Sequence, residues 1–203
     1  HKNAQQFAAI GGKLEATLHV DHVATNAQYP NKPPAYSVVI GQVHAFQLDD
    51  EQQKAGYGLG NEPLKISYKK WPNHSTGSVF WTYERNLATN DPDRIDIAYP
   101  VWGSNWDDPS DPGDKGIALG EEFSYEVNIV ENTMHLVFTS IEHGTVHQHI
   151  NLADNIDANG NIDEADYPLA YQDETLYFKA GAYNQCSTKK NDPSFRYPGC
   201  SGT

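Results

Sequence analysis

The sequence has few cations, a single Met, only two Cys and no long apolar run among its 203 residues. A bilayer crossing takes about 18 to 20 consecutive apolar residues, so we expect no membrane-spanning segment and no membrane partner. Fourteen Lys and Arg stand against 27 Asp and Glu, which gives a net charge of -13. Because nucleic acids attract cationic proteins, this balance disfavours a nucleic-acid partner.

The two cysteines, Cys186 and Cys200, lie near the end of the sequence in a stretch rich in Asn, Ser, Lys, Pro and Gly. Such a stretch has too little apolar surface to order itself by burial. We therefore predict a disulfide between them, which the chain-entropy account credits with about 3 kcal/mol. A disulfide implies an oxidising compartment, so the protein is expected to be secreted, either extracellular or periplasmic. Two free surface thiols are the alternative.

Apolar and polar residues alternate with a period of two along most of the sequence, and this period is typical of half-buried strands. Only residues 5–10 favour a short helix, which the following Gly pair would end. The predicted strands are residues 14–20, 36–46, 65–69, 78–85, 94–99, 123–130, 134–141 and 176–185. We predict a single all-β domain, residues 1–203: a two-sheet antiparallel β-sandwich, or jelly roll, with a concave substrate cleft.

The predicted strand 36–46 places a carboxamide and an imidazole together on one face, because alternate residues of a strand point to opposite sides. The compact inner face is predicted to consist of Val39, Gly41, Val43 and Ala45. The opposite face is predicted to carry Ile40, Gln42, His44 and Phe46.

The predicted strand 176–185 divides in the same way. Its core face is predicted to carry Leu176, Phe178, Ala180 and Ala182. The other face, which we interpret as a binding floor, is predicted to carry Tyr177, Lys179, Gly181, Tyr183 and Gln185. Phenol, ammonium, amide and imidazole groups on solvent-facing strand positions suit an acidic sugar chain.

At these two segments the sequence resembles a known family. Residues 41–44, Gly-Gln-Val-His, match the Gln-(Ile/Val)-His motif of alginate lyases of polysaccharide lyase family 7 and the related family 18. Residues 177–185, Tyr-Phe-Lys-Ala-Gly-Ala-Tyr-Asn-Gln, match the C-terminal signature of the same family. The family's third signature, an Arg-x-Glu-x-Arg strand before the Gln-x-His strand, is absent from this sequence, so we expect the domain to lack that N-terminal strand.

The resemblance implies an endo-acting alginate lyase that cleaves 1,4-linked uronate chains by β-elimination and releases unsaturated oligosaccharides. On the family's pattern, Gln42 hydrogen-bonds the C6 carboxylate, and His44 neutralises it or acts as base. Tyr183 gives a proton to the glycosidic oxygen, while Tyr177 and Lys179 hold neighbouring sugars. The implied chemistry needs no cofactor, and a monomer that binds alginate is expected.

A second pattern lies in residues 155–166, where oxygen-bearing side chains alternate around a Gly as in a calcium-binding loop. The run departs from the EF-hand pattern because it starts with Asn and ends with Asp, and a polar turn is an equal alternative. The predicted ligands of a structural calcium ion are Asp157, Asn159, Asn161, Asp163 and Asp166.

The same sequence bears on two other classes of function. A glycoside hydrolase needs paired carboxylates, but residues 94–99 keep only the central Asp96 of the Glu-x-Asp-x-x-Glu pattern. A non-catalytic carbohydrate-binding module for acidic polysaccharide stays the main alternative, since it shares fold and aromatic surface. His147 and His149 are interpreted as surface residues of one strand face, and Arg85 as either a cleft residue or a salt-bridge partner.

Overall fold

A computed structural model describes residues 12–27, 29–46, 61–88, 90–166, 171 and 175–185. The described residues form nine strands and one short 3-10 helix, η1 (Gly113–Lys115). The strands are β1 (Gly12–Leu18), β2 (Ser37–Phe46), β3 (Leu64–Lys69), β4 (Ser78–Glu84), β5 (Asp96–Trp102), β6 (Phe123–Val130), β7 (Thr133–Ser140), β8 (Gly144–Asn151) and β9 (Thr175–Asn184). Within this part of the chain, no helix has the length and apolar character that a membrane span requires.

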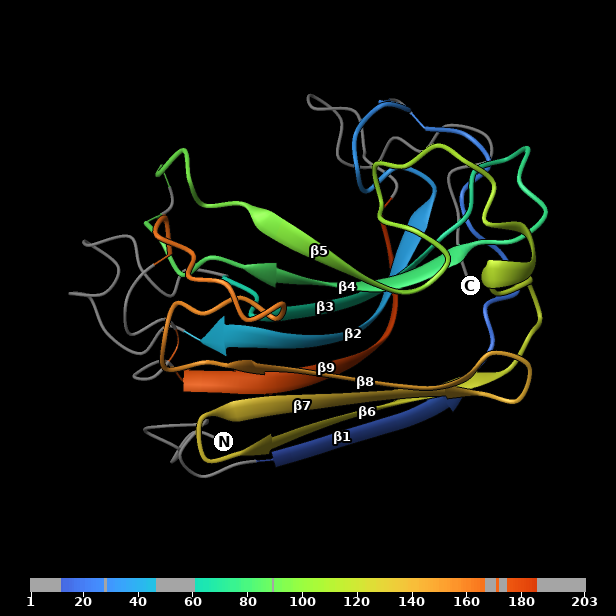
Figure 1. The fold of residues 1–203 in the computed structure, drawn as a ribbon. Helices are drawn as coiled ribbons and strands as arrows, with labels where there is room; N and C mark the ends of the chain where they lie inside the picture. The colour runs from blue at the N-terminus through green and yellow to red at the C-terminus, as the bar shows by residue number, and fades with distance from the viewer. Residues whose placement is uncertain are drawn as a thin grey trace.

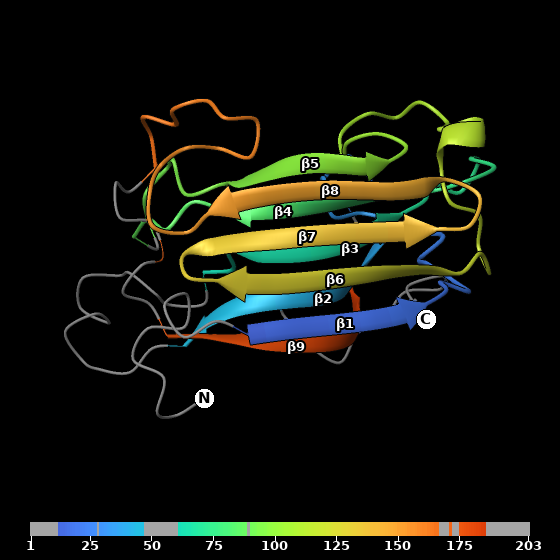
Figure 2. The ribbon, with the colours of Figure 1, turned by 60° about the horizontal axis from the view of Figure 1, so that its bottom comes forward.

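The strands form two antiparallel sheets that lie face to face (Figure 1). One sheet has the order β1-β6-β7-β8, and the other has the order β5-β4-β3-β2-β9. Figure 2 shows that β9 and β1 lie at the same side of the sandwich, with β5 and β8 at the opposite side. The predicted all-β jelly-roll sandwich is therefore confirmed.

The core fills the space between the sheets with alternate side chains from each strand. The five-stranded sheet contributes Ile66, Val79 and Trp81, and the four-stranded sheet contributes Val127 and Leu136, all at most 1% exposed. Burying a large apolar side chain stabilises the fold by about 1.5 to 3 kcal/mol. The opposite face of the five-stranded sheet is thus free to carry polar groups.

A register shift in the middle of β2 separates its two halves. Val39 pairs with Tyr183 and Gly41 pairs with Ala180, so β9 has one residue more than β2 across this step. Gly181 lies inside the step with a φ of 145°, a backbone conformation that favours glycine. Such a bulge bends a strand and changes the direction of the side chains beyond it.

The shift corrects part of the predicted alternation in β2. Ile40, predicted to face outward, is 5% exposed and belongs to the core, whereas Val39 lines the surface groove described below. A period of two cannot reveal such a change, because a bulge adds a residue without a sequence signature of its own. From Gly41 to Ala45 the prediction is confirmed, with Val43 in the core and Gln42 on the opposite face.

The predicted core face of β9 is also only half correct. Leu176 is fully buried and Phe178 packs against the core, as predicted. Ala180 and Ala182 are instead exposed and line the groove. Among the described strands β9 is an edge strand, and between its bulged half and Ala16 and Leu18 of β1 lies a further cavity.

The alternation of apolar and polar residues did not predict strand β8. Its inward positions read Val146, Gln148 and Ile150, and the central Gln interrupts the apolar period. The structure gives that amide a partner from the other sheet, because the indole Nε1 of Trp81 donates a hydrogen bond to Gln148 Oε1 at 2.6 Å. His147 and His149 are exposed on the outer face of β8, which confirms their interpretation as surface residues.

Candidate active site

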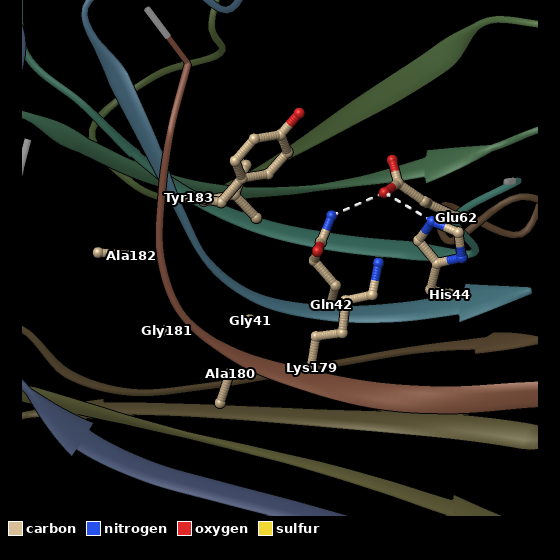
Figure 3. A pocket seen from close by; sticks show the side chains of 10 residues that line it. Gly41, Gln42, His44, Glu62, Lys179, Ala180, Gly181, Ala182 and Tyr183 are labelled. Carbon is tan, nitrogen blue, oxygen red and sulfur yellow. Dashed lines mark hydrogen bonds and ion pairs between the residues drawn. The ribbon is translucent and has the colours of Figure 1, made fainter.

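A groove of about 410 Å³ lies on the five-stranded sheet where β2 and β9 run side by side (Figure 3). It brings together the two segments that the sequence places at opposite ends of the chain. Its lining residues are Val39, Gly41, Gln42, His44, Glu62, Lys179, Ala180, Gly181, Ala182 and Tyr183. The structure thus places the predicted residues Gln42, His44, Lys179 and Tyr183 in one groove.

Gln42 occupies the middle of the groove. In the sheet register it stands between Lys179 on β9 and Lys65 on β3, so the three side chains share one face. Gln42 is buried, with an exposed fraction of 5%. Its amide Nε2 donates a hydrogen bond to Glu62 Oε1 at 2.7 Å.

His44 lies one step further along β2, opposite Tyr177. Its Nδ1 is 2.7 Å from the carbonyl oxygen of Ala45, which can only accept, so Nδ1 carries a proton and donates. Its Nε2 is 3.5 Å from Glu62 Oε1. The Nε2 atom is therefore the ring nitrogen that faces Glu62 and the groove.

The β9 side of the groove carries an ammonium group and two phenols. Lys179 Nζ lies 5.2 Å from the ring centre of Tyr177, and this ring lies 5.3 Å from the imidazole of His44. Tyr177 thus packs beside the groove rather than along its lining. Tyr183 is 59% exposed and points over the groove from the bulged half of β9 (Figure 3).

Glu62, just before β3, is the groove residue that the sequence did not single out. It follows Gln42 by 20 positions, and a lone carboxylate before a strand is usually a solvated charge. In the structure its Oε2 forms an ion pair with Lys65 Nζ at 2.9 Å. The Glu-Pro-Leu-Lys spacing of residues 62–65, with a cation three positions after the carboxylate, could have indicated the ion pair but not the contact with Gln42.

Lys65 also contacts Asp96 on β5, at 2.8 Å. Burial opposes its charge, but the carboxylates of Asp96 and Glu62 outweigh burial and raise the pKa of Lys65. Asp96 is therefore held by an ion pair rather than presented as a catalytic acid. This placement supports the interpretation that residues 94–99 are not a hydrolase motif.

Loops cover the rest of this sheet face. Trp106 packs edge to face on Phe80 with ring centres 6.0 Å apart, and Phe80 is fully buried. Lys69 at the end of β3 is 2% exposed; its Nζ donates to the carbonyl oxygen of Pro33 at 2.5 Å and lies 4.0 Å from the ring centre of Trp71. Among the described residues, loops therefore cover Phe80 and Lys69, while the groove over β2 and β9 is open.

Buried Lys69 gives the fold a specific pH dependence. Burial lowers the pKa of Lys69 to about 8, against the opposing pull of Asp107. The unfolded chain binds the proton up to about pH 10.5, so the free energy of unfolding should rise with pH between these values, by about 2 kcal/mol. Urea unfolding at pH 7 and pH 10 measures this rise, and the variant Lys69→Met should lack it. An equal rise in the free energy of unfolding of the wild type and of Lys69→Met would contradict the assignment of this pH dependence to Lys69.

The loop predicted to bind calcium is held together by its own side chains. Asp157 Oδ1 accepts hydrogen bonds from the backbone nitrogens of Asn159 and Asn161, at 2.9 Å and 2.8 Å. Asp163 Oδ2 pairs with Arg85 Nε at 2.8 Å. Arg85 is thus a salt-bridge partner, one of its two predicted alternatives.

Asp166, the last predicted ligand, is 7% exposed and accepts a hydrogen bond from the Tyr83 hydroxyl at 2.7 Å. Among the described residues, no group of three or more His, Cys, Asp and Glu side chains is placed to hold a metal ion. Calcium binding by this loop stays a prediction. Cys186 and Cys200 lie outside the described residues, as does the segment 5–10, so the disulfide and the short helix stay predictions as well.

The fold and the groove together define a jelly-roll sandwich with a polar site on one sheet. The chain belongs to the alginate lyase family, whose profile matches residues 1–200. The resemblance inferred from residues 41–44 and 177–185 is therefore confirmed.

Individual relatives agree with this assignment. An alginate lyase of Klebsiella pneumoniae is 32% identical over 191 residues, which are 93% of this chain and 53% of the relative. The crystal structure of the exolytic PL7 alginate lyase AlyA5 from Zobellia galactanivorans matches with a TM-score of 0.75 and 36% identity, over 96% of this chain and 65% of that one. The crystal structure of an alginate lyase from Klebsiella pneumoniae matches with a TM-score of 0.59 and 30% identity, over 87% of this chain and 52% of that one. The chain thus spans between half and two thirds of the length of these relatives.

Proposed function

We propose that this protein is a polysaccharide lyase that cleaves alginate by β-elimination. The observation that supports the proposal most is the convergence of Gln42 and His44 from β2 with Lys179 and Tyr183 from β9 on one groove. Family membership supports the same activity. A uronate chain offers this groove a carboxylate at every sugar, and Lys179 supplies a cation that offsets the repulsion from a protein of net charge -13.

The first proposed step makes the C5 proton of the sugar acidic. Gln42 donates a hydrogen bond to the C6 carboxylate, and His44 brings its Nε2 to the same group. Neutralising the carboxylate stabilises the charge that develops when the C5 proton leaves. His44 as the base that takes this proton is the alternative within the same geometry.

The second proposed step breaks the glycosidic bond. The Tyr183 hydroxyl donates a proton to the departing C4 oxygen, and for one epimer the same residue first takes the C5 proton. A C4–C5 double bond forms as the C4–O bond breaks. Tyr177 and Lys179 hold the sugars on either side, since the cation and the ring lie against each other beside the reacting groups.

Ultraviolet absorbance distinguishes this proposal from a non-catalytic carbohydrate-binding module. Elimination creates an unsaturated uronate that absorbs in the ultraviolet, whereas binding alone leaves the spectrum of alginate unchanged. We expect absorbance to rise when the full-length gene product is mixed with alginate. Binding without any rise would replace the lyase proposal with the binding-module alternative.

We further propose an endo-acting mode, in which cleavage occurs within the chain. A groove on the open face of β2 and β9 supports passage of a polymer on both sides of the reacting sugar. The expected result is a rapid fall in the viscosity of alginate, with unsaturated oligosaccharides as early products. Early release of single sugars with little change in viscosity would instead indicate an exolytic mode, the mode stated for AlyA5.

A polymer substrate too large to enter cells also supports our proposal that the protein works outside the cytoplasm. The predicted disulfide between Cys186 and Cys200 favours the same compartment. Mass analysis of the protein with and without reduction tests the disulfide, since its reduction adds two hydrogen atoms.

A further inference from the structure

The carboxylate of Glu62 contacts both groups that the proposed reaction places on the substrate carboxylate. One oxygen, Oε1, accepts the amide hydrogen of Gln42 at 2.7 Å and lies 3.5 Å from His44 Nε2. The other oxygen, Oε2, is held by Lys65 Nζ at 2.9 Å. The side chain is only 16% exposed, so the groove lining holds it in place (Figure 3).

The main chain around Glu62 is fixed on two sides. Its backbone nitrogen donates to Glu84 Oε2 at 2.7 Å, and Glu84 is held in turn by Arg94 Nε at 3.0 Å. The preceding residue, Asn61, accepts a hydrogen bond from the backbone nitrogen of Ala45 at 2.8 Å. A proline follows directly and restricts Glu62 to an extended conformation. Glu62 is therefore anchored to β4 and to the part of β2 that carries His44.

This anchored carboxylate determines how Gln42 and His44 are presented. A carboxylate only accepts hydrogen bonds, so the nitrogen end of the Gln42 amide must face it, and the second hydrogen of that nitrogen is left for a ligand. The carbonyl oxygen of Ala45 fixes the proton on His44 Nδ1. Glu62 thus faces the other imidazole nitrogen, Nε2, which the Ala45 carbonyl leaves available for a ligand.

We propose that Glu62 is a positioning residue, which acts through Gln42 and His44 and holds both in the orientation that receives the substrate carboxylate. This inference rests on the proposed function, since it assigns a role to these two residues in catalysis. It also explains why a negative charge is kept in a groove for an acidic chain. Lys65 balances that charge, and Lys179 stays directed at the ligand side.

The kinetic test replaces Glu62 by its neutral isostere. In Glu62→Gln the new amide can turn either end toward Gln42, so the fixed orientation is lost. We expect kcat on alginate to fall about 10- to 100-fold with KM near that of the wild type, as for misplaced catalytic groups. Glu62→Asp keeps the negative charge on a shorter side chain, so its kcat should lie between those of Glu62→Gln and the wild type. Glu126→Gln, at an ion pair with Lys13 on the outer sheet, is the matched control and should keep full activity.

A second measurement does not depend on activity. In the wild type, the side-chain amide protons of Gln42 should give separate, downfield-shifted NMR signals because one of them binds a carboxylate. Glu62→Gln should remove that shift, while Glu126→Gln should preserve it. Thermal unfolding of each variant checks that the fold is intact.

The two proposals fail in different ways. A wild-type protein without lyase activity would overturn the proposed function, and the Gln42 signals would still decide whether Glu62 orients that amide. If Glu62 only balances Lys65, then Glu62→Gln will lower the unfolding temperature and leave kcat and the Gln42 signals unchanged. That result would overturn the positioning role.

Discussion

The variant Tyr183→Phe is expected to lose lyase activity by about 1,000-fold while it keeps its affinity for alginate. Removing one hydroxyl leaves the ring over the groove but takes away the proton that the glycosidic oxygen needs, and general acid catalysis contributes about 100- to 10,000-fold. Tyr183 is 59% exposed on the edge strand β9, so the fold does not depend on that hydroxyl. The rate of ultraviolet absorbance increase measures activity, and calorimetric titration with alginate oligomers measures affinity.

A matched tyrosine separates this effect from general changes. Tyr29 is 54% exposed and lies outside the groove lining, so Tyr29→Phe should be as active as the wild type. If Tyr183→Phe kept more than a tenth of the wild-type rate, another group would have to protonate the leaving oxygen. Loss of affinity together with rate would instead indicate that Tyr183 mainly binds the sugar.

The variant Gly41→Ala should destabilise the protein by about 2 kcal/mol, although it adds only a methyl group. A Cβ at this position would lie 2.7 Å from the hydroxyl oxygen of Tyr125 and 2.9 Å from its Cζ, which is too close. Tyr125 cannot move away freely, because it is 2% exposed and its hydroxyl donates to the carbonyl oxygen of Ile40 at 2.8 Å. Overpacking of this kind typically costs about 1 to 3 kcal/mol. Urea unfolding measures the loss.

The partner variant Tyr125→Phe tests the cause of that loss. Without the hydroxyl, the ring loses both its nearest clashing atom and its hydrogen bond, so the cost of Gly41→Ala should be smaller in this background. Additive costs would show that the methyl group acts on something other than Tyr125. Because Gln42 follows directly, activity should fall with stability in Gly41→Ala.

The alternation of apolar and polar residues predicted the facing of side chains correctly where the strands are regular, and wrongly beside the bulge. Gln42 and His44 face the groove as predicted because they lie two residues apart on the regular part of β2, and Lys179 pairs with Gln42. Tyr183 reaches the same groove from beyond the bulge in β9, which alternation does not explain. Ile40 was placed wrongly, since the bulge beside it adds a residue that no local pattern marks. The catalytic roles themselves stay predictions.

Long-range contacts explain the remaining omissions. Glu62 reaches the groove only because β3 pairs with β2, and a separation of 20 residues carries no period that could indicate this. Strand β8 was missed because Gln148 stands where an apolar residue is expected. Its partner, Trp81, lies 67 positions earlier on the other sheet, and only the folded structure brings the two together.

The bond between Trp81 and Gln148 also bears on how the two layers find their alignment. Aliphatic side chains pack nearly as well after a small slide of one layer over the other, so they discriminate weakly between neighbouring alignments. The indole of Trp81, which is fully buried, tolerates such a slide poorly, because an offset that leaves a buried donor without its acceptor costs about 1 to 3 kcal/mol. Gln148, a polar residue at an inward position, thus favours one alignment of the two sheets over alignments shifted slightly from it.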